Sequence, residues 1–307
     1  MKNKQQSAST NIKPSETIRA AKTWTDFSHL RWSGIDKPTS RLGKIKIEKF
    51  LRENNFPHLK VLKVFNSASN INLDNTPDCF VLKPSSLWSG KGVMLLHKIA
   101  NLREYYDSKS GKVISVSSIK ESGLRLENEI GKKINFIIEE RALDEDSNVN
   151  IPFDYKVFTF FGIPKFILQV DRNHSTPKIA FFDGEFNPIT DDRVMISDPK
   201  KNDIAGIHRT PKCAENILRL ASDITLKLNA SFISVDCYAT TKGAMFGELT
   251  HTPGGPWYGS MYRFSENFEN ELGAAWAEAY KKLDLPIPNI KTPYEIKFKG
   301  NTIRTIY

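Results

Sequence analysis

Residues 232–255 read FISVDCYATTKGAMFGELTHTPGG, and two strand-like runs flank the turn Thr241-Lys242-Gly243. The turn glycine suits a three-residue hairpin loop, because such a loop needs one residue in the left-handed conformation. The register that follows from this loop sets Asp236 opposite Glu248. Because side chains alternate along a strand, both carboxylates are expected on the same face of the hairpin.

Directly opposed carboxylates repel each other, so a cation is expected between them. Hard divalent cations prefer carboxylate oxygens, which makes Asp236 and Glu248 candidate metal ligands. The same register places Ser234 opposite Thr250 on that face. The alternative is a solvated hairpin with two surface acids, since a slip of one residue sends the two carboxylates to opposite faces.

A second motif lies upstream, where FVLKP ends a strand in Lys83 and the loop SSLWSGKG (residues 85–92) follows. Small residues let backbone amides approach phosphate oxygens, and lysines add positive charge. The loop matches neither the Walker A pattern nor the dinucleotide-binding glycine pattern, and a plain hairpin explains it as well. Lys156 lies mid-strand in DYKVFTFF, where a solvent-facing position is the common alternative.

The order of strands and helices is typical of an α+β protein. Two helices have readable ends, one from Pro211 to about Leu228 and one after the expected N-cap Ser265 to about Leu283. The expected division is a disordered tail (1–14), a small basic α/β domain (15–77), a unit with the glycine loop (78–140), a unit with the carboxylate hairpin (141–283) and a C-terminal tail (284–307).

Composition excludes several classes of protein. Hydrophobic residues make up 39% of the 307 residues, and no apolar run approaches the roughly 20 residues of a membrane helix. The start of the chain is not typical of a signal peptide or a membrane anchor. Three widely spaced cysteines argue against a disulfide framework or a zinc cluster, and they are expected to be small buried hydrophobes.

Charge is concentrated near the N-terminus. Residues 1–65 hold 14 Lys or Arg against 5 Asp or Glu, which equals the whole net charge of +9. Such a face can meet an anionic partner, and a solvated face with a disordered tail is the alternative. No module for specific nucleic-acid binding is recognisable.

Taken in order, FVLKP with its glycine loop, FIIEER, DYKVFTFFGIPKFI and the carboxylate hairpin resemble the ATP-grasp superfamily, most closely its TupA-like branch associated with cell-surface polysaccharide biosynthesis. The resemblance covers about residues 78–258. It implies an ATP-grasp fold, in which two α+β subdomains (78–140 and 141–283) clamp ATP behind a smaller N-terminal domain.

The resemblance also implies roles for single residues. Lys83 resembles the phosphate-binding lysine, Lys156 resembles a second nucleotide-contacting lysine, and Asp236 and Glu248 resemble ligands of Mg²⁺. Further residues implied to contact ATP, in the flexible loop and in the hinge strand beside the adenine, are Ser86, Ser89, Gly90, Lys91, Gly92, Glu139, Glu140, Arg141 and Ala142.

Two positions depart from the superfamily pattern. Ser234 stands where many members carry Arg near the transferred phosphate, and Thr250 stands where a metal-binding Asn is usual. Thr250 offers the metal only a neutral hydroxyl, although TupA-like sequences commonly read ELTxTPG here, as this chain does.

The implied activity is ATP-dependent ligation of a carboxylate, on a small molecule or a glycan, to an amine. Candidates for gripping the second substrate are Arg172, which is counted with the catalytic residues, and His174, His251, Trp257, Tyr258 and Arg263. A ligase acting on peptides or natural products, and a degenerate ATP-grasp that only binds an anionic polymer, remain alternatives. The expected location is the cytoplasm, including the inner face of the membrane.

Overall fold

The computed structural model describes residues 16–38, 44–87, 90–100, 102–197, 204–255, 258–298 and 301–307. Of residues 44, 45 and 298 only the backbone is described. The tail 1–14, the loop residue Ser89 and the substrate candidate Trp257 lie outside these ranges.

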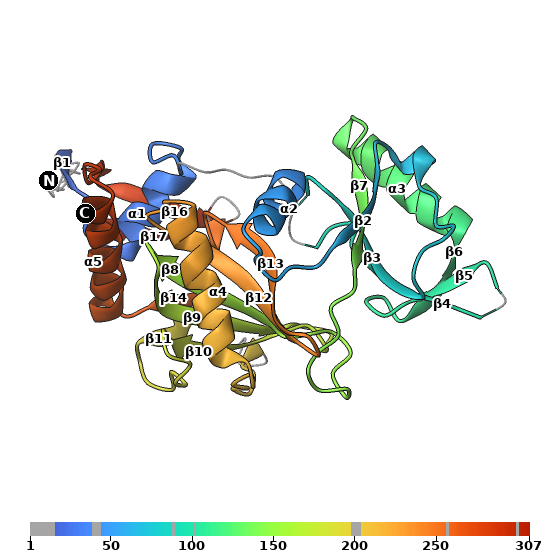
Figure 1. The fold of residues 1–307 in the computed structure, drawn as a ribbon. Coiled ribbons are helices and arrows are strands. Elements are labelled where there is room, and N and C mark those ends of the chain that lie inside the picture. Colours follow the sequence, from blue (N-terminus) through green and yellow to red (C-terminus); the bar gives the residue numbers. More distant parts are fainter. Residues whose placement is uncertain are drawn as a thin grey trace, which may run out of the picture.

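Two lobes, each built around one antiparallel sheet, make up the fold (Figure 1). The smaller lobe contains β2 (Val61–Phe65), β3 (Cys79–Pro84), β4 (Met94–Lys98), β5 (Glu104–Asp107), β6 (Lys112–Ser115), α3 (Val116–Ile130) and β7 (Phe136–Glu140). Its strands form a six-stranded sheet with the order β2-β7-β3-β4-β5-β6. Helix α3 covers the face that carries Phe80, Leu82 and Phe136.

A short 3-10 helix, Ala68–Asn70, packs on α3 in the smaller lobe, and the larger lobe holds the other elements. These are β1 (Thr17–Ala20), α1 (Trp24–Trp32), α2 (Lys44–Glu53), β8 (Asp154–Phe160), β9 (Ile163–Asp171), β10 (Lys178–Asp183), β11 (Val194–Ile196), α4 (Ala214–Lys227), β12 (Ile233–Thr240), β13 (Gly243–Thr250), β14 (Tyr262–Phe264), α5 (Glu266–Lys282), β15 (Asn289–Thr292), β16 (Tyr294–Phe298) and β17 (Asn301–Ile306). Its main sheet has five strands in the order β10-β9-β8-β12-β13. The two antiparallel sheets with packed helices confirm the α+β class.

Helices cover both faces of the five-stranded sheet. Helix α4 buries Ile217 and Ile224 against Val157 and Val235 on one face. On the other face, Trp24 of α1 is fully buried, with its ring centroid 5.2 Å from that of Phe158. Side chains alternate along β8, so every second residue lies on this face. At one end of the strand the face packs on α1 and α5, and at the other end it carries polar side chains.

Residues 15–77 were expected to form a separate N-terminal domain, but the described part of this range, 16–38 and 44–77, is shared between the two lobes. Strand β1 pairs with β15, and α1 packs on α5, both in the larger lobe. Strand β2 instead pairs with β7 as the edge of the smaller lobe's sheet. The sequence did not reveal this division, because it depends on pairing with segments more than 70 residues away.

The C-terminal residues pack on the larger lobe rather than extending from it. The Tyr294 hydroxyl donates to a carboxylate oxygen of Asp26 at 2.9 Å, and Arg304 forms an ion pair with the buried Glu269. Burial acts to raise the pKa of Asp26, but hydrogen bonds from Arg19, two backbone amides and Tyr294 outweigh it and hold that pKa below its usual range. The first contact ties the C-terminal residues to α1 near the start of the described chain, and the second ties them to α5.

The carboxylate hairpin has the expected pairing at its acidic end but a different turn. Thr240 pairs with Gly243, so two residues rather than three form the loop. Gly243 has a φ of 91°, in the left-handed region as expected. A bulge at Gly247 then shifts the register by one residue, so that Asp236 does lie opposite Glu248. A Cβ at Gly247 would lie 2.8 Å from the Tyr238 ring, which accounts for glycine at this bulge.

The helix boundaries agree closely with the sequence. Ser265 caps α5 by accepting a hydrogen bond from the Phe268 amide, as predicted. Helix α4 begins at Ala214, three residues after the expected Pro211. In the described part of the chain, no helix is long and apolar enough to span a membrane.

Gly273 of α5 is expected to tolerate no side chain. An added Cβ would lie 2.0 Å from the Lys22 carbonyl oxygen, at the crossing of α5 with the start of α1. We expect Gly273→Ala to lower the free energy of unfolding by more than about 2 kcal/mol, although alanine gains about 1 kcal/mol in helix propensity. Urea unfolding measures this loss. Ala274→Gly, at the exposed neighbouring position, is the control for the difference in helix propensity. A Gly273→Ala variant more stable than the wild type would contradict the close approach of α5 to Lys22.

Candidate active site

A row of charged side chains crosses three neighbouring strands of the five-stranded sheet. Asp236 on β12 pairs in register with Lys156 on β8 and with Glu248 on β13. The Lys156 ammonium donates a hydrogen bond to Asp236, whose side chain is buried, whereas Glu248 is exposed. The sheet therefore brings three of the predicted site residues side by side.

Asp154 extends this row and was missed in the sequence. Its carboxylate is buried and lies 2.9 Å from Lys156 and 2.9 Å from Arg172. Asp154 thereby links Arg172 to the row. The signal was present, because Asp154 precedes Lys156 by two residues in a strand and must share its face.

The row carries more negative than positive charge. Asp154, Asp236 and Glu248 supply three carboxylates, and Lys156 and Arg172 supply two cations. Among the described residues Glu248 has no cationic side chain within 4 Å. The group of five therefore has room for a further positive charge beside Asp236 and Glu248.

The two buried carboxylates respond differently to this environment. Burial raises the pKa of Asp236 to about 7, because the attraction to Lys156 that lowers this pKa is partly offset by repulsion from Asp154 and Glu248. Burial also acts to raise the pKa of Asp154, but two cations, Lys156 and Arg172, hold it below its usual range. Asp236 is thus the carboxylate that would gain most from an added cation.

Ser234 and Thr250 lie directly opposite each other next to the acidic pair. Ser234 is fully buried, and its hydroxyl donates to Asp236 at 3.3 Å. Ser234 supports the Asp236 carboxylate but brings no positive charge. The described residues contain no group of three or more His, Cys, Asp or Glu side chains poised around one metal ion, so a cation here would need water or substrate oxygens as well.

Lys83 lies on the face of the smaller sheet opposite to α3. Its ammonium contacts Glu139 of β7 at 2.5 Å, and Lys83 pairs in register with Ile137. Both charged side chains are largely buried. The expected phosphate-binding lysine and the first acid of the expected hinge strand are therefore neighbours.

The glycine loop is held at two points. Lys91 forms an ion pair of 2.6 Å with Glu129 of α3. Lys109, which the sequence analysis did not single out, donates to the Gly90 carbonyl at 2.6 Å. Gly92 adopts a φ of 73°, which glycine allows at little cost. Ser86 is exposed at the start of this loop.

The hinge after β7 contacts the tip of the carboxylate hairpin. Glu140 forms an ion pair with Lys242, which holds the pKa of Glu140 below its usual range. The Thr241 amide donates to the Leu143 carbonyl at 3.1 Å. Arg141 is buried and turns toward His97, and Ala142 is half-buried. The hinge therefore ties the two lobes together at the hairpin.

The remaining candidates for a second substrate do not form one group. Tyr258 is buried, and its hydroxyl accepts a hydrogen bond from the Phe264 amide at 2.9 Å. It is therefore part of the hydrophobic core. His174 lies 3.1 Å from Asp171, close in sequence to Arg172. Arg263 is exposed on β14, and His251 is half-buried after β13. Arg172 is the candidate that the structure brings to the charged row.

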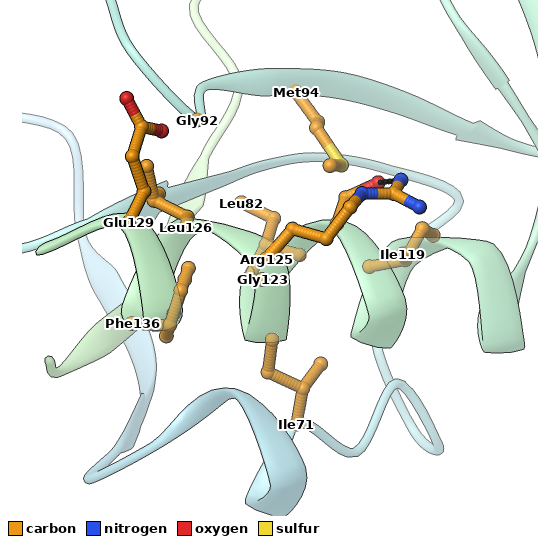
Figure 2. A pocket seen from close by; sticks show the side chains of 11 residues that line it. Ile71, Leu82, Gly92, Met94, Ile119, Gly123, Arg125, Leu126, Glu129 and Phe136 are labelled. Atoms are coloured by element: carbon orange, nitrogen blue, oxygen red, sulfur yellow. Dashed lines mark hydrogen bonds between the residues drawn. The ribbon is translucent and has the colours of Figure 1, made fainter. Parts of the chain in front are cut away.

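A cavity of about 210 Å³ lies between α3 and the smaller sheet (Figure 2). Its walls are mainly apolar and include Leu82, Met94, Ile119 and Phe136. Because Leu82 and Lys83 point to opposite faces of β3, this cavity lies on the other side of the sheet from Lys83. The cavity is therefore separate from Lys83 and from the charged row, although Glu129, the partner of Lys91, lines it.

Residues 32–277 match the protein-family model described as TupA-like ATP-grasp. The chain belongs to the TupA-like ATP-grasp family. The match spans both lobes and includes every charged residue of the row and of the Lys83 pair. Membership confirms the ATP-grasp fold. None of the curated proteins matches the chain.

Solved structures with a similar fold are distant from this TupA-like protein. They include the ATP-grasp ligase PsnB complexed with minimal precursor, at 10% identity and a TM-score of 0.41, covering 81% of this chain and 63% of that one. D-alanine–D-alanine ligase from Bacillus anthracis complexed with ATP has 13% identity and a TM-score of 0.43, covering 78% and 65%. A RimK domain ATP-grasp protein from Sphaerobacter thermophilus has 12% identity and a TM-score of 0.41, covering 78% and 66%. The chain thus spans about three fifths to two thirds of their lengths.

Proposed function

We propose that this TupA-like protein is an ATP-dependent ligase that joins a carboxylate to an amine through an acyl phosphate. The observation that carries the proposal is the acidic pair Asp236 and Glu248, which face each other beside Lys156 with unbalanced negative charge. A pair of oxygen ligands next to a cationic side chain suits the phosphates of ATP together with Mg²⁺.

The fit of Mg²⁺ rests on the donor set of this pair. Burial and neighbouring acids raise the pKa of Asp236 to about 7, so the charged form of this carboxyl is disfavoured. A divalent cation bound beside it would stabilise that charged form. Asp236, Glu248 and the hydroxyl of Thr250 would hold the ion. Bound there, Mg²⁺ would neutralise charge on the phosphates of ATP.

The two lobes supply the remaining nucleotide contacts in this proposal. Lys83 binds phosphate oxygens from the smaller lobe, and the backbone of the glycine loop covers them. Lys156 binds them from the larger lobe, and the hinge from Glu139 to Ala142 meets the adenine. Residues 78–140 and 141–283 would act as the two halves of the clamp.

The proposed reaction has two steps. The substrate carboxylate attacks the γ-phosphorus of ATP, ADP leaves, and an acyl phosphate forms. The amine then attacks the acyl carbon, phosphate leaves, and the amine loses a proton to give an amide. Phosphoryl transfer spreads negative charge over the oxygen atoms of the transferred group. The positive charges of Lys83, Lys156 and Arg172 would stabilise that negative charge.

We include in this proposal a substrate class that the charge of the chain supports. A uronic-acid-containing glycan or its precursor would suit the basic residues near the N-terminus, such as Lys60 and Lys63 on and beside the edge strand β2. Peptide or natural-product substrates fit the same nucleotide site. Dependence on ATP favours a cytoplasmic location, including the inner face of the membrane.

Nucleotide binding tests the proposal without knowledge of the substrate. We expect ATP with Mg²⁺ to stabilise the protein by about 2.7 kcal/mol at a hundredfold excess over Kd. Thermal unfolding measures this, with ATP plus EDTA and with Mg²⁺ alone as controls. No stabilisation by ATP would overturn the ligase assignment. Mg²⁺-dependent binding without phosphate release, across a screen of uronic acids and amines, would favour the degenerate binding protein.

A further inference from the structure

The turn between β5 and β6 holds the backbone of Lys109 in a fixed place. The Asp107 carboxylate is buried and accepts hydrogen bonds from the backbone amides of Leu95, at 2.8 Å, and Lys109, at 3.2 Å. The Ser108 amide donates to the Leu95 carbonyl at 2.9 Å, and Gly111 follows with a φ of 69°. These hydrogen bonds fasten the turn to β4, so the Lys109 side chain extends from an anchored backbone.

The side chain of Lys109 reaches the end of the glycine loop. Its ammonium donates to the Gly90 carbonyl at 2.6 Å and to the Val93 carbonyl at 3.3 Å. Val93 leads into β4, whose first residue pairs with Leu82 next to Lys83. The Lys109 ammonium therefore lies near the strand end that carries the expected phosphate-binding lysine.

Lys109 differs from the other cations of the candidate site in its partners. A carboxylate oxygen lies within 4 Å of each of Lys83, Lys91, Lys156 and Arg172. Among the described residues, no carboxylate oxygen lies that close to the Lys109 ammonium, and its two acceptors are neutral carbonyls. Hydrogen bonds from an ammonium to an anion are stronger than those to a neutral oxygen. Lys109 would therefore gain from an anionic ligand.

The hinge connects the turn of Lys109 with the larger lobe. Arg141 donates to the Ser108 hydroxyl at 3.2 Å and to the Asn150 carbonyl at 3.1 Å. The Asn173 side chain bonds both the backbone amide and the carbonyl of Ile151, each at 2.8 Å. The turn between β5 and β6 and the residues after β9 are therefore both held to the same short segment, 150–151.

This arrangement brings two cations toward each other from different lobes. Lys109 follows Ser108 in the chain, and Arg172 precedes Asn173. Loss of water around the ammonium lowers the pKa of Lys109, although the residue is exposed overall. Attraction to Asp107 opposes this shift, and repulsion from Arg172 adds to it. An anion placed between the two cations would replace their repulsion by two attractions.

We propose that Lys109 is a phosphate-binding residue, and that together with Arg172 it holds an anionic phosphoryl group between the two lobes. On binding, phosphate oxygens replace the carbonyls of Gly90 and Val93 as the acceptors of the Lys109 ammonium. The ligand is a terminal phosphate of a nucleoside triphosphate, and this identification rests on the proposed function.

Calorimetry of ATP binding in the presence of Mg²⁺ tests the proposal with Lys109→Met. We expect the Kd for ATP to rise about tenfold or more, because a hydrogen bond between opposite charges is lost. Lys112→Met is the matched control, since Lys112 is an exposed lysine of the same hairpin, and it should bind ATP like the wild type. An unchanged Kd in Lys109→Met, or an equal rise in Lys112→Met, would overturn the proposal.

Two further substitutions separate phosphate binding from support of the glycine loop. Lys109→Gln keeps a donor for the Gly90 carbonyl but has no charge, so it should lose ATP affinity as Lys109→Met does. Lys109→Arg keeps the charge and should retain most of the affinity. Wild-type affinity in Lys109→Gln would show that Lys109 only supports the loop, against the proposal. Because Lys109 is exposed, all of these variants should unfold at the wild-type urea concentration.

Inorganic tripolyphosphate separates this proposal from the proposed function, because it carries phosphates without a nucleoside. Suppose that the wild type binds tripolyphosphate but not ATP. The ligase proposal would then be wrong, and the anion site would stand if Lys109→Met weakened tripolyphosphate binding about tenfold while Lys112→Met did not. Tripolyphosphate binding that Lys109→Met leaves unchanged would reject the site. A wild type that binds neither ligand would reject both proposals.

Discussion

The Glu248→Gln variant should release phosphate from ATP on the order of a hundredfold to a thousandfold more slowly than the wild type, with its fold intact. Glutamine keeps the shape of glutamate and removes its charge. Glu248 is exposed and has no ion pair among the described residues, so its loss costs little stability. The substitution cancels the unbalanced negative charge that makes a cation site beside Asp236.

Phosphate release is measured with the carboxylate and amine that give the highest wild-type rate in the screen. Raising the Mg²⁺ concentration should restore part of the activity, because the variant keeps Asp236. Glu215→Gln, at an exposed position in the first turn of α4, is the matched control and should retain the wild-type rate. Wild-type turnover by Glu248→Gln would remove the hairpin from the active site.

The sequence predicted the facing acids correctly, although for an incomplete reason. Counting from a three-residue turn sets Asp236 opposite Glu248, and the observed two-residue turn alone would have set them out of register. The bulge at Gly247 restores the pairing. A bulge of one glycine depends on how the Tyr238 ring packs against the neighbouring strand, which no pattern of residues records.

Other parts of the site differ in how far the sequence could reveal them. Asp154 could have been predicted from the sequence, because residues two apart in a strand share a face. Lys109 was not, because its contact with Gly90 requires the turn between β5 and β6 to fold back over the glycine loop. The same holds for Arg141, whose place in the hinge was expected but whose contact with His97 depends on pairing across three strands.

The second large effect is expected from Lys156→Met, which removes the cation between two buried carboxylates. Loss of one partner from a buried ion pair typically costs about 3–5 kcal/mol in the free energy of unfolding. Two features moderate the cost here. Asp154 keeps its contact with Arg172, and Asp236 can protonate because its pKa is already raised to about 7. We therefore expect a loss near the lower end of that range at pH 7.

The loss should depend on pH in a direction that the pKa of Asp236 fixes. A carboxyl whose pKa is higher in the folded than in the unfolded protein favours folding when protonated, and this advantage disappears as pH rises through the folded value. Removing Lys156 takes away an attraction that lowers the pKa of Asp236, so that pKa rises further. Lys156→Met should accordingly lie closer to wild-type stability at pH 6 than at pH 8.

Urea unfolding at pH 6 and pH 8, in EDTA, measures both effects. Lys98→Met, at an exposed position of β4, is the control and should change the stability little at either pH. Adding Mg²⁺ at pH 8 should recover part of the loss in Lys156→Met, because a divalent cation can replace the ammonium beside Asp236 and Glu248. An equal loss at both pH values, unaffected by Mg²⁺, would mean that Lys156 acts through packing of its alkyl chain. Its charge would then not be what balances the buried acids, and the excess negative charge assigned to the row would have to be supplied by other groups.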